Sequence, residues 1–305
     1  MLSPKIEEKL RILEQKYTPM GQSLEAYLDG LIYSDFISYW DYINLDALLN
    51  LQQPRTNFPD ENIFITYHQI TELYFKLILQ ELTQIPQNAS NGAFMLEKIR
   101  RTNRYFSHLI TSFDIMVEGM DREQFLQFRM ALLPASGFQS AQIRMIELVS
   151  THFVNLTKDP ETQTSAPTIA EMYPFIYWKR GASELTTGKK TLTLLKFEHK
   201  YDKILLELAQ SYEHTNICAV FEALPETEKT PELVAELRQY DLNVNVRWKL
   251  MHLKSAMRYL QQPKQVVAAT GGTNWQQYLP PKNQLRTFFA PIWSSQELAD
   301  WGKSM

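Results

Sequence analysis

The segment Pro59–Ile85, PDENIFITYHQITELYFKLILQELTQI, constrains the fold of this chain more than any other stretch. Its first acidic residues follow a proline and precede a long apolar run, which is typical of a helix N-terminus. Apolar and aromatic side chains fill most of the segment, and polar ones recur every three or four residues on one stripe: Asn62, Thr66, Gln69, Glu72, Lys76 and Gln80. We therefore expect a long helix that is largely buried.

His68 lies away from this polar stripe, one turn after Phe64. A buried imidazole without a partner is costly, so a histidine on the inner face needs a polar neighbour or a ligand. A second histidine, His252, follows Trp248 by one turn in VRWKLMHLKSAMRYL, again on an aromatic face. The pattern alone leaves core histidines and ligand-binding histidines as open alternatives.

The rest of the chain predicts an all-α protein that forms a single large domain, residues 1–305. Glycine accounts for only 10 of 305 residues, below its usual share of about 7%. Apolar residues repeat with helical period along most of the length. Further helices are expected over residues 3–16, 22–29, 45–52 (with Asn44 as N-cap), 93–117, 121–133, 139–154 (with Ser136 as cap), 197–212 and 233–260, the last broken near Asp241.

Composition excludes several functional classes. The net charge of −3 and the pI near 6.1 give no basic patch, so nucleic acid is not an expected partner. The single cysteine, Cys218, cannot form an internal disulfide and fits a reducing compartment. The N-terminal sequence lacks the apolar core of a signal peptide, and no apolar run reaches the roughly 18–20 residues that span a bilayer. We expect a soluble, cytoplasmic protein with no membrane partner.

Two further segments carry candidate binding residues. Arg129 is flanked by Phe125 and Phe128, where an arginine either extends to solvent, pairs with a carboxylate, or binds a substrate carboxylate. Gly137, which follows Ser136, permits a tight turn or the close approach of a ligand to the backbone. No zinc-type cysteine and histidine spacing, phosphate-binding loop or nucleophile motif is present. Two inward histidines on separate helices are one way to hold haem, and the residues alone leave this among several candidates.

Four segments in this order resemble the tryptophan 2,3-dioxygenase family. They are YWDYINLDALLNLQ (39–52), PDENIFITYHQITELYFK (59–76), FRMALLPASGFQSAQIR (128–144) and RWKLMHLKSAMR (247–258), the last followed by TGG at 270–272. The third is the most specific. The resemblance implies an all-α haem b enzyme, usually a homotetramer, that uses O2 to open the indole C2–C3 bond of L-tryptophan and gives N-formylkynurenine.

The resemblance also implies the residues of the cofactor side. His252 would be the proximal ligand of the haem iron, and Trp248 would pack beside it and help to orient it. Arg258 falls where the family has an arginine near the haem. Ser136 and Gly137 would line the pocket close to the haem.

On the substrate side, His68 would lie above the iron as the catalytic histidine and accept a hydrogen bond from the indole N–H. Arg129 would bind the substrate carboxylate, and Thr270 would contact the ammonium group. The pocket walls would come from Phe64, Phe125, Tyr39, Tyr42 and Ile43, of which the last three belong to an N-terminal segment (1–54) that would reach a neighbouring subunit.

The chain diverges from the family at the substrate loop, which reads TGGTNW where the family usually has TGGSSG. The exact indole substrate and the number of oxygen atoms inserted therefore stay open. Two alternatives remain: a related haem oxygenase that acts on another or a substituted indole, and a haem-binding helical protein without catalysis.

Overall fold

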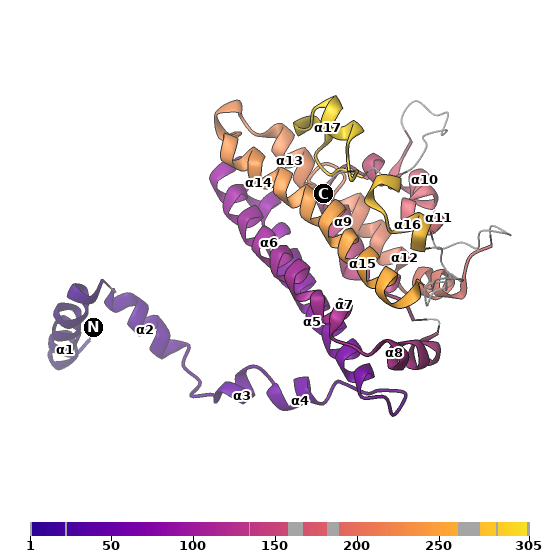
Figure 1. The fold of residues 1–305 in the computed structure, drawn as a ribbon. Helices are drawn as coiled ribbons and strands as arrows, with labels where there is room; N and C mark the ends of the chain where they lie inside the picture. Colours follow the sequence, from indigo (N-terminus) through magenta and orange to yellow (C-terminus); the bar gives the residue numbers. More distant parts are fainter. Residues whose placement is uncertain are drawn as a thin grey trace. The chain divides into compact units, whose positions relative to one another are not determined.

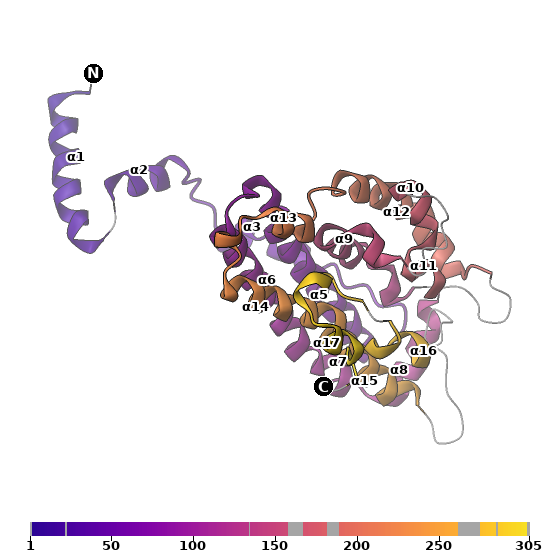
Figure 2. The same ribbon diagram turned by 90° about the horizontal axis from the view of Figure 1, so that it is seen from above.

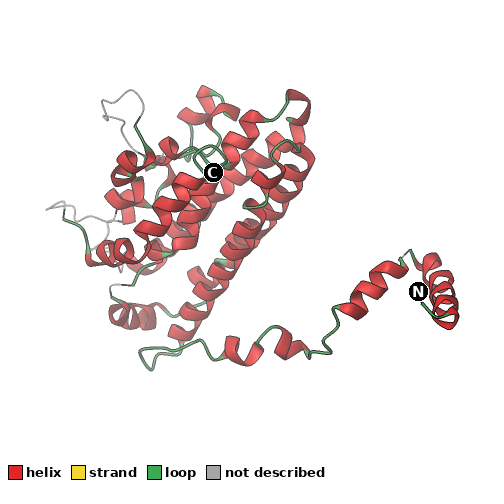
Figure 3. Cartoon of the chain, turned by 180° about the vertical axis from the view of Figure 1, so that it is seen from behind, coloured by secondary structure: helices red, strands yellow, loops and turns green. Residues whose placement is uncertain are grey.

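The computed structural model describes residues 2–21, 23–133, 135–157, 167–181, 189–261, 275–284 and 286–303. Their regular secondary structure is helical, and these ranges contain no β-strand (Figure 3). The all-α prediction is confirmed. In the same part of the chain no helix is long and apolar enough to cross a membrane.

The chain divides into two compact units, Met1–Gln53 and Pro54–Met305. The first unit contains α1 (Pro4–Tyr17), α2 (Leu24–Ile32), α3 (Tyr39–Tyr42) and α4 (Leu45–Leu49) (Figure 1). The rings of Tyr17 and Tyr27 stack with centroids 4.0 Å apart. None of these four helices buries a residue, so the first unit has no core of its own.

The helix predicted over residues 45–52 is shorter than expected, because α4 ends at Leu49. Asn44 does precede it, but its backbone is left-handed, with φ at 52°, and its side chain makes no capping hydrogen bond. Asparagine tolerates this conformation better than most residues, which explains its place there. The predicted side-chain cap is wrong.

The second unit is built around two long helices, α5 (Asp60–Leu82) and α6 (Gly92–Ser112), that lie side by side in both ribbon views (Figures 1 and 2). α14 (Pro231–Leu242) packs on α6, and α9 (Ala141–Ser150) packs between α5 and α12 (Leu192–Ser211). The remaining helices of the described residues are α7 (Asp114–Glu118), α8 (Arg122–Phe128), α10 (Ile169–Met172), α11 (Tyr177–Gly181), α13 (Ile217–Ala223), α15 (Trp248–Leu260), α16 (Trp275–Tyr278) and α17 (Ser295–Ala299).

Several predicted boundaries move. The helix predicted over 121–133 is α8 followed by a 3-10 turn, Arg129–Leu132. The helix predicted over 139–154 is α9, which starts later because Ser140, and not Ser136, caps it. α12 begins before residue 197, since the Thr191 side chain already accepts a hydrogen bond from the Leu194 N–H.

α5 confirms the predicted long helix but is buried on one side only. Tyr67, Phe75 and Ile78 are almost fully buried, whereas Leu73 is 50% exposed. The exposed apolar residues follow helical spacing: Ile70, Leu73 and Leu77. The expectation of a largely buried helix is wrong for this face. Periodicity identifies apolar residues but does not tell which of them a neighbouring element covers.

The predicted break near Asp241 is a π-helical turn, Asn243–Arg247, that joins α14 to α15. A π turn accommodates one additional residue and therefore rotates the following helix face by about 100° relative to an uninterrupted α-helix. Trp248 and His252 come directly after this turn. The turn therefore sets the direction in which these two side chains point.

Asp241 ties this turn to the C-terminal segment. Its fully buried carboxylate accepts hydrogen bonds from the Phe288 N–H (2.9 Å), the Phe289 N–H (3.2 Å), the Trp293 indole N–H (3.0 Å) and the Asn245 amide (2.8 Å). Burial raises the pKa of Asp241 to about 6, and these donors act in the opposite direction. The group is therefore mostly ionised at neutral pH.

We expect Asp241→Ala to lower the free energy of unfolding by at least about 2 kcal/mol, because it leaves buried N–H donors without an acceptor. The matched control is Asp300→Ala, since that side chain is 54% exposed, and we expect it to change stability by less than about 0.5 kcal/mol. Urea unfolding followed by circular dichroism measures both. Equal stability of the two variants would contradict the anchoring role of Asp241.

Candidate functional site

His68 and His252 make the same local hydrogen bond on two different helices. The Nδ1 of His68 lies 2.7 Å from the Phe64 carbonyl oxygen, and the Nδ1 of His252 lies 2.8 Å from that of Trp248. A carbonyl oxygen can only accept, so each Nδ1 carries the proton and donates it. Each imidazole is thereby fixed as the tautomer whose Nε2 offers a lone pair to a ligand.

Both imidazoles are neutral at pH 7. Burial lowers the pKa of His68 and lowers that of His252 to about 4, because an apolar environment disfavours the charged ring. Positive charge on His68 and on Lys249 contributes to this lowering of the pKa of His252. The two histidines are thus close enough to interact electrostatically. A neutral imidazole is the form that can bind a metal ion.

Aromatic rings hold His252 in place. Trp248 packs edge-on against it, with centroids 4.5 Å apart and an interplanar angle of 78°. Phe113 lies 4.6 Å from the imidazole and 5.1 Å from Trp248, and Phe75 of α5 approaches Trp248 at 5.9 Å. Phe113 was not predicted as a site residue. The helical pattern placed it only on an inner face, and its contact with residue 252 is a tertiary one.

A second set of rings surrounds His68. Phe64 lies 4.1 Å from its imidazole and 6.3 Å from Phe125 of α8. Phe125 in turn lies 5.5 Å from Phe128 and 4.6 Å from Tyr259 of α15. α5, α8 and α15 therefore meet through one aromatic layer that contains the predicted residues Phe64 and Phe125.

Arg129 begins the 3-10 turn that follows α8, and α8 packs against α5. Its side chain is only 4% exposed. Burial lowers the pKa of Arg129, but a guanidinium keeps its charge at neutral pH. The structure thus supplies a buried cation next to the aromatic layer. Such a group suits a carboxylate ligand, because a guanidinium can donate two parallel hydrogen bonds to it.

Ser136 and Gly137 form a capped 3-10 turn. The Ser136 hydroxyl accepts a hydrogen bond from the Phe138 N–H, and Gln139 accepts one from the Ser136 N–H. The Gln139 side chain then donates to the Thr193 carbonyl, which ties the turn to α12. Among the described residues, a Cβ atom at Gly137 would meet no heavy atom within 4 Å. These residues therefore leave space beside the glycine, and its role next to a ligand stays a prediction.

The other predicted residues lie elsewhere. Arg258 forms a surface ion pair with Glu118 at 3.6 Å, and its side chain is 45% exposed. Tyr39 and Tyr42 are exposed, and Ile43 half-buried, in the unit Met1–Gln53. Thr270 lies outside the described residues.

The described residues thus define an all-helical protein in which two half-buried, neutral histidines pack against aromatic rings. The sequence profile of the tryptophan 2,3-dioxygenase family matches residues 31–152, which include His68, Arg129 and Gly137. The chain is 28% identical to the tryptophan 2,3-dioxygenase of Bacillus anthracis over 292 residues, which cover 90% of this chain and 98% of that protein.

Other relatives match a shorter part. The tryptophan 2,3-dioxygenase of a Ruegeria species is 40% identical over 119 residues, which cover 38% of this chain and 42% of that protein. Tryptophan 2,3-dioxygenase 2 of Ralstonia nicotianae is 42% identical over 125 residues, 37% of this chain and 34% of its own. The chain is thus similar to tryptophan 2,3-dioxygenases over most of its length and diverges from them in sequence.

Proposed function

We propose that this protein is a haem-dependent dioxygenase that cleaves the indole C2–C3 bond of L-tryptophan with O2 to give N-formylkynurenine. The observation that carries the proposal is the pair of neutral histidines, each with Nδ1 bound to its own helix and Nε2 available. The similarity to tryptophan 2,3-dioxygenases, over residues 31–152 in the family profile and over 90% of the chain in the Bacillus anthracis protein, supports the reaction class.

The donor set of the site fits haem b. His252 would ligate the iron through Nε2, and its Nδ1–H bond to the Trp248 carbonyl holds the ring orientation that such a ligand needs. Trp248 and Phe113 restrict rotation of the imidazole. Ser136 and Gly137 would line the cofactor, and Arg258 would be the arginine near it that the family resemblance implies. When bound, ferrous haem supplies the site that activates O2.

His68 is proposed to orient the substrate. With its proton on Nδ1, its Nε2 can accept a hydrogen bond from the indole N–H. Phe64, 4.1 Å from the imidazole, would pack against the indole ring. The substrate itself supplies the electrons, so the residues here position C2 and C3 rather than transfer hydride. We therefore assign His68 as an orienting partner in the catalytic site.

The amino acid part of the substrate is assigned to Arg129 and Thr270. The buried guanidinium would bind the carboxylate, and the threonine of the TGGTNW loop would contact the ammonium group. Phe125 adjoins Phe64 and would close the pocket beside the ring. The remaining wall would come from the N-terminal segment: Tyr39, Tyr42 and Ile43.

We further propose a homotetramer in which the unit Met1–Gln53 of one subunit completes the pocket of a neighbour. Tyr39 is 70% exposed and Tyr42 75% exposed, and the unit buries none of its helical residues. α5 carries an apolar stripe at Ile70, Leu73 and Leu77 that is 37–50% exposed. Apolar surface on this scale is typical of an interface between chains.

One observation favours a second candidate, oxidation of a different or substituted indole. The substrate loop reads TGGTNW, and asparagine and tryptophan occupy more space than the serine and glycine usual in the family. The mass of the product separates the candidates, because ring cleavage adds two oxygen atoms to the substrate indole.

Replacing the two histidines should separate cofactor binding from turnover. We expect His252→Ala to lose haem, because no other imidazole occupies its place, and His68→Ala to keep haem while activity falls at least tenfold. The pyridine haemochrome assay measures haem per chain, and N-formylkynurenine formation measures turnover. His214→Ala, at an exposed position, should match the wild type in both. Haem loss from His68→Ala but not from His252→Ala would mean that the two roles are exchanged.

Arg129→Ala should raise KM for L-tryptophan by roughly 10- to 150-fold, because a charge-assisted contact to a carboxylate contributes about 1.5–3 kcal/mol. Steady-state kinetics with L-tryptophan and with tryptamine, which has no carboxylate, test the assignment. The variant should lose its discrimination between these two substrates. Arg104→Ala, at an exposed position on α6, is the control. An unchanged KM in Arg129→Ala would remove this residue from the substrate site.

A further inference from the structure

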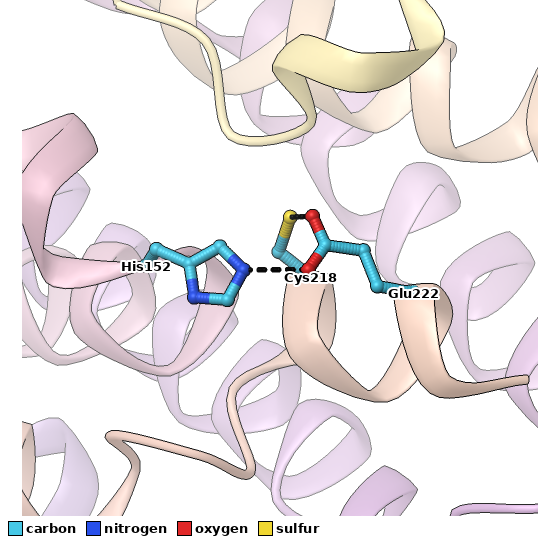
Figure 4. A group of neighbouring side chains, drawn as sticks. All are labelled: His152, Cys218 and Glu222. Carbon is cyan, nitrogen blue, oxygen red and sulfur yellow. Dashed lines mark hydrogen bonds and ion pairs between the residues drawn. The ribbon is translucent and has the colours of Figure 1, made fainter.

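A second cluster of potential ligands lies away from the histidine pair on the helices of the second unit. His152 follows the end of α9 and precedes the 3-10 turn Phe153–Leu156, while Cys218 and Glu222 lie one turn apart on α13 (Figure 4). Cys218 is the only cysteine of the chain. Three chemically different donors, a thiol, an imidazole and a carboxylate, thus converge from two elements.

The donor atoms are nearly at metal-binding distances from one another. The Nε2 of His152 lies 2.9 Å from a Glu222 carboxylate oxygen, and the Cys218 thiol donates to the other oxygen at 3.6 Å. One donor atom from each residue can be chosen such that all three lie within 4.8 Å of one another. Bonds of about 2.0–2.3 Å in a tetrahedral zinc site place donors roughly 3.4–3.6 Å apart. Side-chain adjustments of about an ångström would bring all three to this geometry.

The backbone that carries these donors is well held. Asn216, which is 1% exposed, caps α13 by accepting a hydrogen bond from the Ala219 N–H at 3.0 Å. The Thr151 hydroxyl donates to the Phe288 carbonyl at 2.6 Å, which fixes the residue before His152. α9 and α13 also pack against each other. The backbone that carries the three donors is therefore held in place before any ion binds.

Exposure and charge also suit a cation. Cys218 is 1% exposed, while the His152 and Glu222 side chains are 34% and 42% exposed, so an ion could enter from solvent and reach a buried sulfur. Carboxylates surround the thiol, since Glu222 accepts its hydrogen bond and the buried Asp241 acts on it electrostatically. This negative surrounding favours a divalent cation.

We propose that His152, Cys218 and Glu222 form a binding site for Zn²⁺, with water in the fourth position. The thiolate, imidazole and carboxylate donors match the preferences of zinc. On binding, the thiol proton of Cys218 is released to solvent, and so is the proton that His152 Nε2 donates to Glu222, unless it moves to Nδ1 of the same ring. The Nε2 lone pair and one Glu222 oxygen then complete the protein ligands. The ion joins α13 to the end of α9, so its role is to fasten these two elements together.

The test uses the full-length protein loaded with haem, so that the proposed haem ligand His252 is not offered to zinc. After treatment with a chelator, the protein is equilibrated with buffered free Zn²⁺, and zinc per chain is measured by mass spectrometry. We expect one zinc per wild-type chain, and at least a tenfold weaker affinity in Cys218→Ser and in Glu222→Gln. The matched control, His199→Ala, removes an exposed histidine of α12 and should bind zinc as the wild type does.

X-ray absorption at the zinc edge gives an independent result, with one sulfur ligand expected at about 2.3 Å. Zinc should also raise the Tm of the wild type by several degrees and leave that of the Glu222→Gln variant unchanged. Glu222 is partly exposed, so this variant decides the question even where Cys218→Ser fails to fold. The proposal would be overturned if the wild type bound no zinc, or if all variants bound zinc equally and without a sulfur ligand. The three residues would then form an ion pair beside a buried thiol.

Discussion

The proposed chemistry depends on a hydrogen bond from an imidazole Nδ1–H to the carbonyl one turn earlier in the same helix. His252 makes it with Trp248, and His68 makes it with Phe64. The bond fixes the tautomer without a charged partner, and both half-buried rings stay neutral. The Nε2 of His252 could then bind iron, while the Nε2 of His68 could accept a hydrogen bond from the indole N–H of the substrate. A carboxylate partner would instead have favoured the charged ring.

The position of His252 depends in turn on the π-helical turn Asn243–Arg247. Without its additional residue, the face of α15 would be rotated, and Trp248 and His252 would no longer meet Phe113. Asp241 anchors the preceding turn of α14 to the chain at Phe288 and Phe289. The C-terminal segment therefore contributes to the candidate site from a distance, through the register of a helix rather than through contact with a ligand.

The sequence predicted the helical class and the long helices, because these depend on periodic patterns within single segments. It also predicted an interruption near Asp241, and it placed Phe64 one turn from His68 and Trp248 one turn from His252. It missed Phe113, because the contact of this residue with His252 joins positions far apart in the chain. It also overestimated the burial of α5, since periodicity cannot show that Leu73 stays uncovered. The roles of Arg258, Thr270 and the N-terminal tyrosines depend on family resemblance and stay predictions.

The central claim is that this chain uses haem held by His252 to cleave the indole ring of L-tryptophan. The most direct test is an anaerobic absorption spectrum of the haem-reconstituted, reduced protein, followed by admission of air with excess L-tryptophan. The account predicts a Soret band of one haem per chain and growth of the near-ultraviolet absorption of N-formylkynurenine, with one O2 consumed per product. A chain that takes up no haem, or that takes up haem and leaves the indole ring intact, would contradict it.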